Sequence, residues 1–198
     1  MARGRFARPN RGDAWWVKEG MSPGPYDDPE LRPTGERCLL GFGSSAGPPA
    51  LPVLYNNVKQ IVQTKDTIMI LNEINHDARI IRMNATHEPP EIRRWLGDSI
   101  GRWEGDTLVI DTIAFEPNPS GLGLNVPSSA GKHTVERLTL TEERTRLRYE
   151  VTVEDPTYLT GPATLAQQWD HRPDLEFSQD TEACDPNVAA RYRDHVPK

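Results

Sequence analysis

The sequence predicts a mostly β protein that forms an antiparallel up-and-down barrel of lipocalin-like shape. The first observation is a series of eight candidate strands between residues 59 and 172. The second is that turn-forming residues join nearly all of them over short intervals, which is the pattern of an antiparallel meander. The third is physical: closing a meander removes its exposed edges, and eight strands leave an interior that can hold one small ligand. An open sheet or a sandwich remains an alternative, because one sequence does not fix closure.

The expected domain organisation is an irregular N-terminal arm over residues 1–36 and a single barrel domain over residues 37–198. Pro and Gly are dense up to about residue 52, with no sustained period of 2 or 3.6. The basic N terminus is not followed by an apolar segment, so it is not a complete secretory signal. A chain of 198 residues with 36% hydrophobic content is enough for one core.

The strands and their turns follow in order along the chain. Asn75, His76 and Asp77 favour the turn of a first hairpin, and Gly105 with Asp106 favours the turn of a second. The eight expected strands cover residues 59–64, 67–74, 78–84, 99–104, 107–115, 133–142, 144–155 and 162–172.

One or two short helices are expected outside the strands. Residues 90–97 begin with a Pro suited to the first helical position and end at Gly97, a helix stop. Residues 187–192 are the second candidate. The 84–97 segment and the 116–132 loop are expected to cover the barrel mouth, because long connections in compact domains are usually functional or disordered.

Residue alternation assigns the two faces of each strand. Tyr149 and Val151 belong to an apolar face with their alternate neighbours, Leu147 and Val153. Glu136 shares a face with Leu138 and Leu140, so it points into the core and needs a partner such as an Arg or a Tyr. On the strand that leads to His76, either Glu73 enters the interior or His76 enters it together with Asn72.

Polar groups that converge inside a barrel suggest a site for acid/base chemistry. His76 and His87 are the side chains best able to exchange protons near neutral pH. Glu136 or Glu73 would orient the histidine, giving His76, His87, Glu136 and Glu73 as the catalytic candidates. The expected function is a cofactor-independent lyase or isomerase that acts on a small cyclic or aromatic molecule. Charge stabilisation and substrate binding are assigned to Tyr55, Asn56, Asn57, Arg79, Trp103, Tyr149 and Trp169.

Several alternatives remain open. The same pocket fits a binding or carrier protein without chemistry, and an accessory structural domain would have no pocket. Glu136 can instead pair with Arg79 or Arg137 in a satisfied network, with the histidines at turns in solvent. Trp103 and Trp169 can close the core rather than stack on a ligand. A metal-dependent hydrolase would use Glu73, His76 and His87, whose spacing matches no standard ligand motif.

Composition and motifs narrow the expected partners. A net charge of −6 argues against nucleic acid. No apolar run approaches the roughly 18 residues that span a bilayer, so no membrane partner is expected. The chain lacks a nucleotide-binding motif and the G-x-S-x-G elbow, which leaves cofactors and serine hydrolysis without support. The oligomeric state stays open.

Cys38 and Cys184 form either one disulfide in an oxidising compartment, as in an exported protein, or two free thiols.

One set of motifs is specific. GRWEGDTLVIDT, with YNNVKQIVQT, HDARIIRM, RRWLGDS and ERLTLTEERTRLRYEVTVEDP, resembles a large group of uncharacterised bacterial proteins with a WEGDTLV signature, many of them exported. The resemblance covers roughly residues 37–184 and implies homology, with no activity to carry over. Members often have a Gly-Asn-Tyr-like segment after the last Cys, where this chain reads CDPNVAARY.

Overall fold

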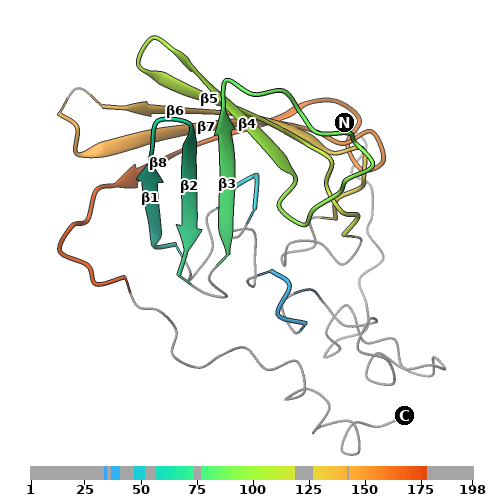
Figure 1. The fold of residues 1–198 in the computed structure, drawn as a ribbon, viewed down its shortest axis with the longest axis horizontal. Coiled ribbons are helices and arrows are strands. Elements are labelled where there is room, and N and C mark those ends of the chain that lie inside the picture. Colours follow the sequence, from blue (N-terminus) through green and yellow to red (C-terminus); the bar gives the residue numbers. More distant parts are fainter. Residues whose placement is uncertain are drawn as a thin grey trace, which may run out of the picture.

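The protein folds into one eight-stranded sheet whose strands lie side by side in chain order (Figure 1). The structure, a computed structural model, describes residues 34, 37–40, 47–51, 57–73, 77–118, 127–141 and 143–177. The prediction of a mostly β fold with eight strands is confirmed. The strands are β1 (Lys59–Gln63), β2 (Thr67–Asn72), β3 (Ala78–Met83), β4 (Asp98–Glu104), β5 (Thr107–Ile113), β6 (His133–Leu140), β7 (Arg146–Glu154) and β8 (Ala163–Asp170).

The strand connections match the predicted meander except at one junction. Both predicted hairpins form, and Gly105 has the positive φ of 60° that a two-residue turn needs. However, β3 and β4 run parallel, so the up-and-down prediction is wrong there. A parallel pair requires the chain to cross back to its starting end. Residues 84–97, which we call the crossover segment, make this crossing.

The short helix predicted over residues 90–97 is wrong. The residues form turns and a parallel bridge to the chain that follows β5. The Arg94 amide donates to the Ala114 carbonyl at 3.0 Å, and the Arg94 carbonyl accepts from the Glu116 amide at 2.9 Å. These backbone groups, which a helix would pair internally, are therefore used to attach the crossover segment to the sheet.

The sheet curls into a half-barrel (Figure 1). β1 and β8 are the two ends of the strand order and do not pair with each other. The Lys59 ammonium of β1 lies 5.8 Å from the centre of the Trp169 ring of β8, so the two edges approach without forming a ladder. The described sheet is thus barrel-like but not closed, which matches the open alternative, and the lipocalin-like shape stays a prediction.

The concave side of the half-barrel holds the main core. Tyr149 and Val151 are buried there, as the alternation on β7 predicts. They pack with Ala50 and with apolar residues of the other strands: Ile68, Ile70, Ile81, Leu108, Ile110 and Leu138.

Residues 47–51 fill part of this concave side. The Ala50 amide donates to the Tyr149 hydroxyl at 3.0 Å, and the Gln167 side chain donates to the Ala50 carbonyl. The buried Lys132 ammonium donates to a second carbonyl of the segment at 3.2 Å. The interior that was predicted to receive a ligand is therefore partly occupied by the protein's own chain.

Some predictions fall outside the described residues. The arm over residues 1–36, apart from Thr34, and the helix over residues 187–192 are among them. Cys38 is disulfide-bonded, and Cys184, the only other cysteine of the chain, is not among the described residues. In the part of the chain that the structure describes, no helix is long and apolar enough to cross a membrane.

Candidate functional site

Two polar clusters lie on opposite faces of β4 and β5. Side chains alternate between faces along a strand, so Ser99 and Thr112 point into the concave side, while Asp98 and Asp111 point to the convex side. Gly97 makes the tight entry to β4 possible. Its φ is 72°, and a Cβ there would lie 2.6 Å from the Thr112 side chain.

The first cluster, which we call the interior network, is centred on Arg79 of β3. Its guanidinium donates to Glu136 through two nitrogens, to the Ser99 hydroxyl at 3.0 Å and to the Thr112 hydroxyl at 2.8 Å. The Tyr149 hydroxyl donates to the Glu136 carboxylate at 2.8 Å. Glu136 is 1% exposed, so the predicted inward carboxylate and its Arg and Tyr partners are confirmed.

The hydrogen bonds of the interior network suit a structural role. Burial, and then the charge of Glu136, raises the pKa of Tyr149 well above its ordinary value, which keeps the phenol protonated as a donor. Of the two partners considered for Glu136, Arg79 is the one found, whereas Arg137 binds Glu104 at 2.9 Å. A buried charge with this many partners avoids the cost of an unpaired one.

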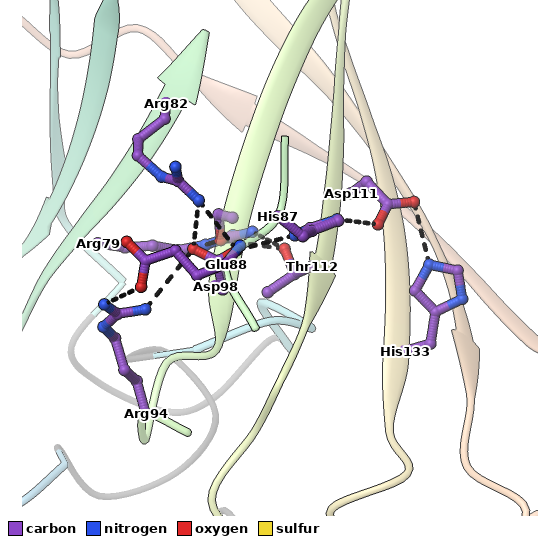
Figure 2. Close-up of polar contacts among 10 residues, drawn as sticks. Arg79, Arg82, His87, Glu88, Arg94, Asp98, Asp111, Thr112 and His133 are labelled. Carbon is purple, nitrogen blue, oxygen red and sulfur yellow. Dashed lines mark hydrogen bonds and ion pairs between the residues drawn. The ribbon is translucent and has the colours of Figure 1, made fainter. Parts of the chain in front are cut away.

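The second cluster, which we call the imidazole–carboxylate chain, consists of Asp98, His87, Asp111 and His133 (Figure 2). His87 Nδ1 lies 2.9 Å from Asp98 and His87 Nε2 lies 2.8 Å from Asp111. His133 Nε2 lies 3.0 Å from the other Asp111 oxygen, and its Nδ1 lies 3.6 Å from Glu154. The chain therefore runs across the convex face from β4 to β6, and Glu154 extends the contacts to β7.

Asp98 is the most connected carboxylate of the chain. Its oxygens accept two bonds from Arg82, at 2.8 and 3.0 Å, and one from the Glu88 amide at 3.0 Å. Arg94 lies 3.6 Å away and binds the Glu88 carboxylate (Figure 2). Burial alone would raise the pKa of Asp98, but the bonds from His87, the Glu88 amide and Arg82 outweigh it and lower the pKa.

Asp111 shows the same balance with fewer partners. Burial would raise its pKa, but the hydrogen bonds from His133 and His87 lower the pKa below the ordinary value. Two ionised carboxylates therefore flank His87. Both nitrogens of an imidazole can donate at once only when the ring is protonated.

A cleft lies where β3 and β4 diverge. The two strands pair only over residues 81–83 and 99–101, so the first half of β3 has no strand neighbour on this side. The resulting space, which we call the β3–β4 cleft, is about 450 Å³. Arg79 and Ser99 of the interior network and Asp98 of the imidazole–carboxylate chain all line it. Its other walls include Leu39, Ile80, Arg82, Glu88, Arg94, Trp95 and Leu96.

The concave interior offers much less room. A second cavity, of about 20 Å³, lies between Lys59, Asn72, Glu136 and Trp169. This is space for about one water molecule. The Lys59 ammonium donates to Asn72 at 2.7 Å, and burial lowers the pKa of Lys59 to about 8. This cavity is too small for the organic molecule that the sequence predicted inside the barrel.

The structure places the predicted catalytic residues in different parts of the molecule. His87 does not lie in solvent at a turn but belongs to the imidazole–carboxylate chain. Glu136 belongs to the interior network. Asn72 is buried on the concave face, whereas Glu73 follows β2 and is half-buried. His76 lies outside the described residues. The prediction that Glu136 orients His87 has no support, because the partners of His87 are Asp98 and Asp111.

The predicted binding residues also differ in position. Arg79 lines the β3–β4 cleft. The Tyr149 and Trp169 rings stack in the core, with centroids 4.8 Å apart and an interplanar angle of 17°. Trp103 is 48% exposed near the end of β4, so the alternative that Trp103 closes the core is wrong. Asn57 is exposed, and Tyr55 and Asn56 lie outside the described residues.

Sequence reasoning missed most of the imidazole–carboxylate chain. Asp98, Asp111 and His133 each precede a buried Ser or Thr that belongs to the concave face. This repeated pattern of a charged residue followed by a small hydroxyl residue in three strands was the available signal. It places hydroxyls on one face and ionisable groups on the other.

Comparisons with known proteins gave no match. No family model, no curated protein and no solved structure matches it. The resemblance to the WEGDTLV group stays a prediction. Among the described residues, no group of three or more His, Cys, Asp or Glu side chains is arranged to hold a metal ion.

Proposed function

We propose that the protein binds a small cyclic or aromatic molecule with oxygen acceptors in the β3–β4 cleft. The observation that carries this proposal is the composition of the cleft, where Ile80, Trp95 and Leu96 provide apolar walls beside the guanidinium groups of Arg82 and Arg94. The volume of about 450 Å³ suits a ligand of this size.

The two arginines keep donors for a ligand. The contacts of Arg82 with Asp98 use one terminal nitrogen, and those of Arg94 with Glu88 and Asp98 use its two terminal nitrogens. Their side chains are 34% and 46% exposed, respectively. A guanidinium has five N–H donors in a planar fork, so both groups can donate to a carbonyl or carboxylate oxygen while they keep these contacts.

Binding without chemistry fits the site better than catalysis. In the imidazole–carboxylate chain, both ring nitrogens of His87 already have carboxylate partners. In the interior network, both oxygens of Glu136 are engaged. His87 and Glu136 are therefore bonded to neighbouring side chains, and neither is among the residues that line the cleft.

One observation favours acid/base catalysis as a second candidate. Asp98 lines the β3–β4 cleft and also contacts His87, which gives a carboxylate–imidazole pair at the edge of a pocket. In this version His87 would exchange a proton after one of its carboxylate contacts opens. Asp98 would orient the ring in place of the predicted Glu136 or Glu73, and a lyase or isomerase reaction would follow.

Binding can be tested with benzoate as the probe, in a titration followed by NMR shifts of backbone amides. We expect the shifts to cluster on the cleft walls. Replacing Arg94 with Gln should weaken binding by roughly tenfold, as the loss of a charged donor does. The matched control is Arg102→Gln, because Arg102 is exposed and paired with Glu104 away from the cleft. Shifts elsewhere, or equal affinity in both variants, would contradict the proposal.

The second candidate needs a separate measurement. A panel of cyclic ketones and carboxylates in deuterated buffer would reveal proton exchange at carbon by NMR. If the wild type exchanges a carbon-bound proton and His87→Gln does not, while benzoate still binds, the acid/base function is supported. If the wild type exchanges none, binding alone stands.

A further inference from the structure

Besides the Arg94 backbone bonds, the crossover segment contacts the convex face through the His87 side chain. Its imidazole contacts β4 through Asp98 and β5 through Asp111. The same segment supplies Glu88, Arg94, Trp95 and Leu96 to the β3–β4 cleft. The ring that bridges two carboxylates is therefore one of the contacts that hold this wall of the cleft in place.

The strength of this attachment depends on the protonation of the ring. A protonated His87 donates to both carboxylates, and each bond is charge-assisted. A neutral ring has one donor, so its other nitrogen presents a lone pair to a carboxylate oxygen at less than 3 Å. The second contact then changes from attractive to repulsive.

We propose that His87 is a pH-dependent latch, which fixes the crossover segment when protonated and loosens it when neutral. If the cleft binds a ligand as proposed above, the latch regulates that site. The latch itself is a property of the free protein and can be measured without any ligand.

Among the described residues, the charged groups around the His87 latch come from β3 to β7 and from the crossover segment. Asp98 on β4 and Asp111 on β5 contact the ring directly. Arg82 on β3 and Arg94 in the crossover segment offset the charge of Asp98. Beyond Asp111 the further charged partners are His133 on β6, Glu154 on β7 and Glu88, which pairs with Arg94.

The carboxylates of the latch do not titrate in the same range as the ring. The pKa values of Asp98 and Asp111 are lowered, so both stay ionised throughout the neutral range. Imidazole is the side chain that changes charge there. The two negative partners of the ring therefore keep their charge across this range.

The test is hydrogen–deuterium exchange of the ligand-free protein at pH 6 and pH 8, corrected for the intrinsic pH dependence of exchange. We expect residues 85–96 to exchange roughly tenfold faster at the higher pH, while β6 and β7 do not change. In His87→Gln the difference between the two pH values should disappear. The matched control, His171→Gln, should keep it, because His171 is exposed at the far end of β8.

A second measurement needs no variant. Nitrogen-15 NMR of the wild-type imidazoles reports whether each ring nitrogen carries a proton. If the latch operates, one of the two His87 nitrogens loses its proton in step with the rise in exchange. Equal exchange at both pH values, or a pH response that persists in His87→Gln, would overturn the latch. Neither result depends on benzoate binding, so the latch and the binding proposal can fail separately.

Discussion

The interior network and the imidazole–carboxylate chain meet at adjacent residues of β4 and β5, yet they differ in kind. The interior network places one ion pair, Arg79 with Glu136, where both partners are almost completely buried. The imidazole–carboxylate chain is partly exposed and alternates titratable groups. Burial makes the first cluster a fixed structural support, and partial exposure leaves the second able to respond to its surroundings. The β3–β4 cleft is lined by members of both clusters.

The largest effect is expected from breaking the interior ion pair. Glu136→Gln leaves the Arg79 charge without its counterion in the core, and we expect a loss of about 3–5 kcal/mol in the free energy of unfolding. Chemical denaturation measures this loss. The double variant Arg79→Met with Glu136→Leu should be less destabilised than the single variant, because no unpaired charge is buried. If the single variant lost nothing, the pair would not be a structural support.

A smaller effect is expected from Asp98, the hub of the imidazole–carboxylate chain. Asp98→Asn removes the charge that Arg82 and His87 bind, and we expect a loss of about 1–3 kcal/mol in the free energy of unfolding. The control is Asp174→Asn, where a fully exposed pair with Arg172 should give no measurable change. Equal losses in both variants would mean that the Asp98 contacts contribute no more than a surface pair.

The free energy of unfolding should also depend on pH in two separate ranges, an acidic one set by the imidazole–carboxylate chain and an alkaline one set by lysines beside the interior network. The pKa values of Asp98 and Asp111 are lower in the folded protein than the ordinary 3.8, so their stabilisation is present above pH 3.8 and is lost as the pH falls below it. Denaturation midpoints between pH 5 and pH 2 check this. Asp111→Asn should show a shallower loss than the wild type.

The lysines beside the interior network should affect stability at the alkaline end of the scale. Burial lowers the pKa of Lys59 and Lys132 from 10.5 to about 8. Between these values the unfolded chain binds more protons, so the free energy of unfolding should rise as the pH increases from about 8 to 10.5. Lys132→Met should reduce this rise. A flat profile in the wild type would show that the amines are not buried in their charged form.

The smallest effect on stability is expected from removing a surface ion pair in place of the buried one. Arg137, the alternative partner considered for Glu136, instead meets Glu104 on the exposed face. Arg137→Gln should therefore leave the denaturation midpoint unchanged. A loss comparable to that of Glu136→Gln would contradict the assignment of the two arginines.

Much of the fold could be predicted from residue pattern. Alternation on β6 and β7 fixed which residues enter the core, and this placed Glu136 inside with Arg or Tyr partners. The parallel pairing of β3 and β4 could not be predicted in this way. It depends on the Arg94 backbone bonding with residues after β5, whereas the local signals over residues 90–97 favoured a helix.

The candidate site was harder to predict than the fold. His87 was identified from its chemistry, but its partners come from other strands, and alternation was used only to find residues that enter the core. Alternation by itself gives no reason to expect that charged residues on the other face are covered. Asp98 is 4% exposed because the crossover segment covers it, and no local pattern indicates that covering.

The segment over residues 47–51 has a consequence for folding kinetics. Ala50 is bonded to Tyr149, 99 positions away, and to Gln167, 117 positions away. Contacts between such distant positions require large loops to close, which is slow compared with the formation of neighbouring hairpins. The hairpins from β4 to β8 can therefore assemble first, and the Ala50 amide should be among the last to gain protection in pulse-labelled refolding.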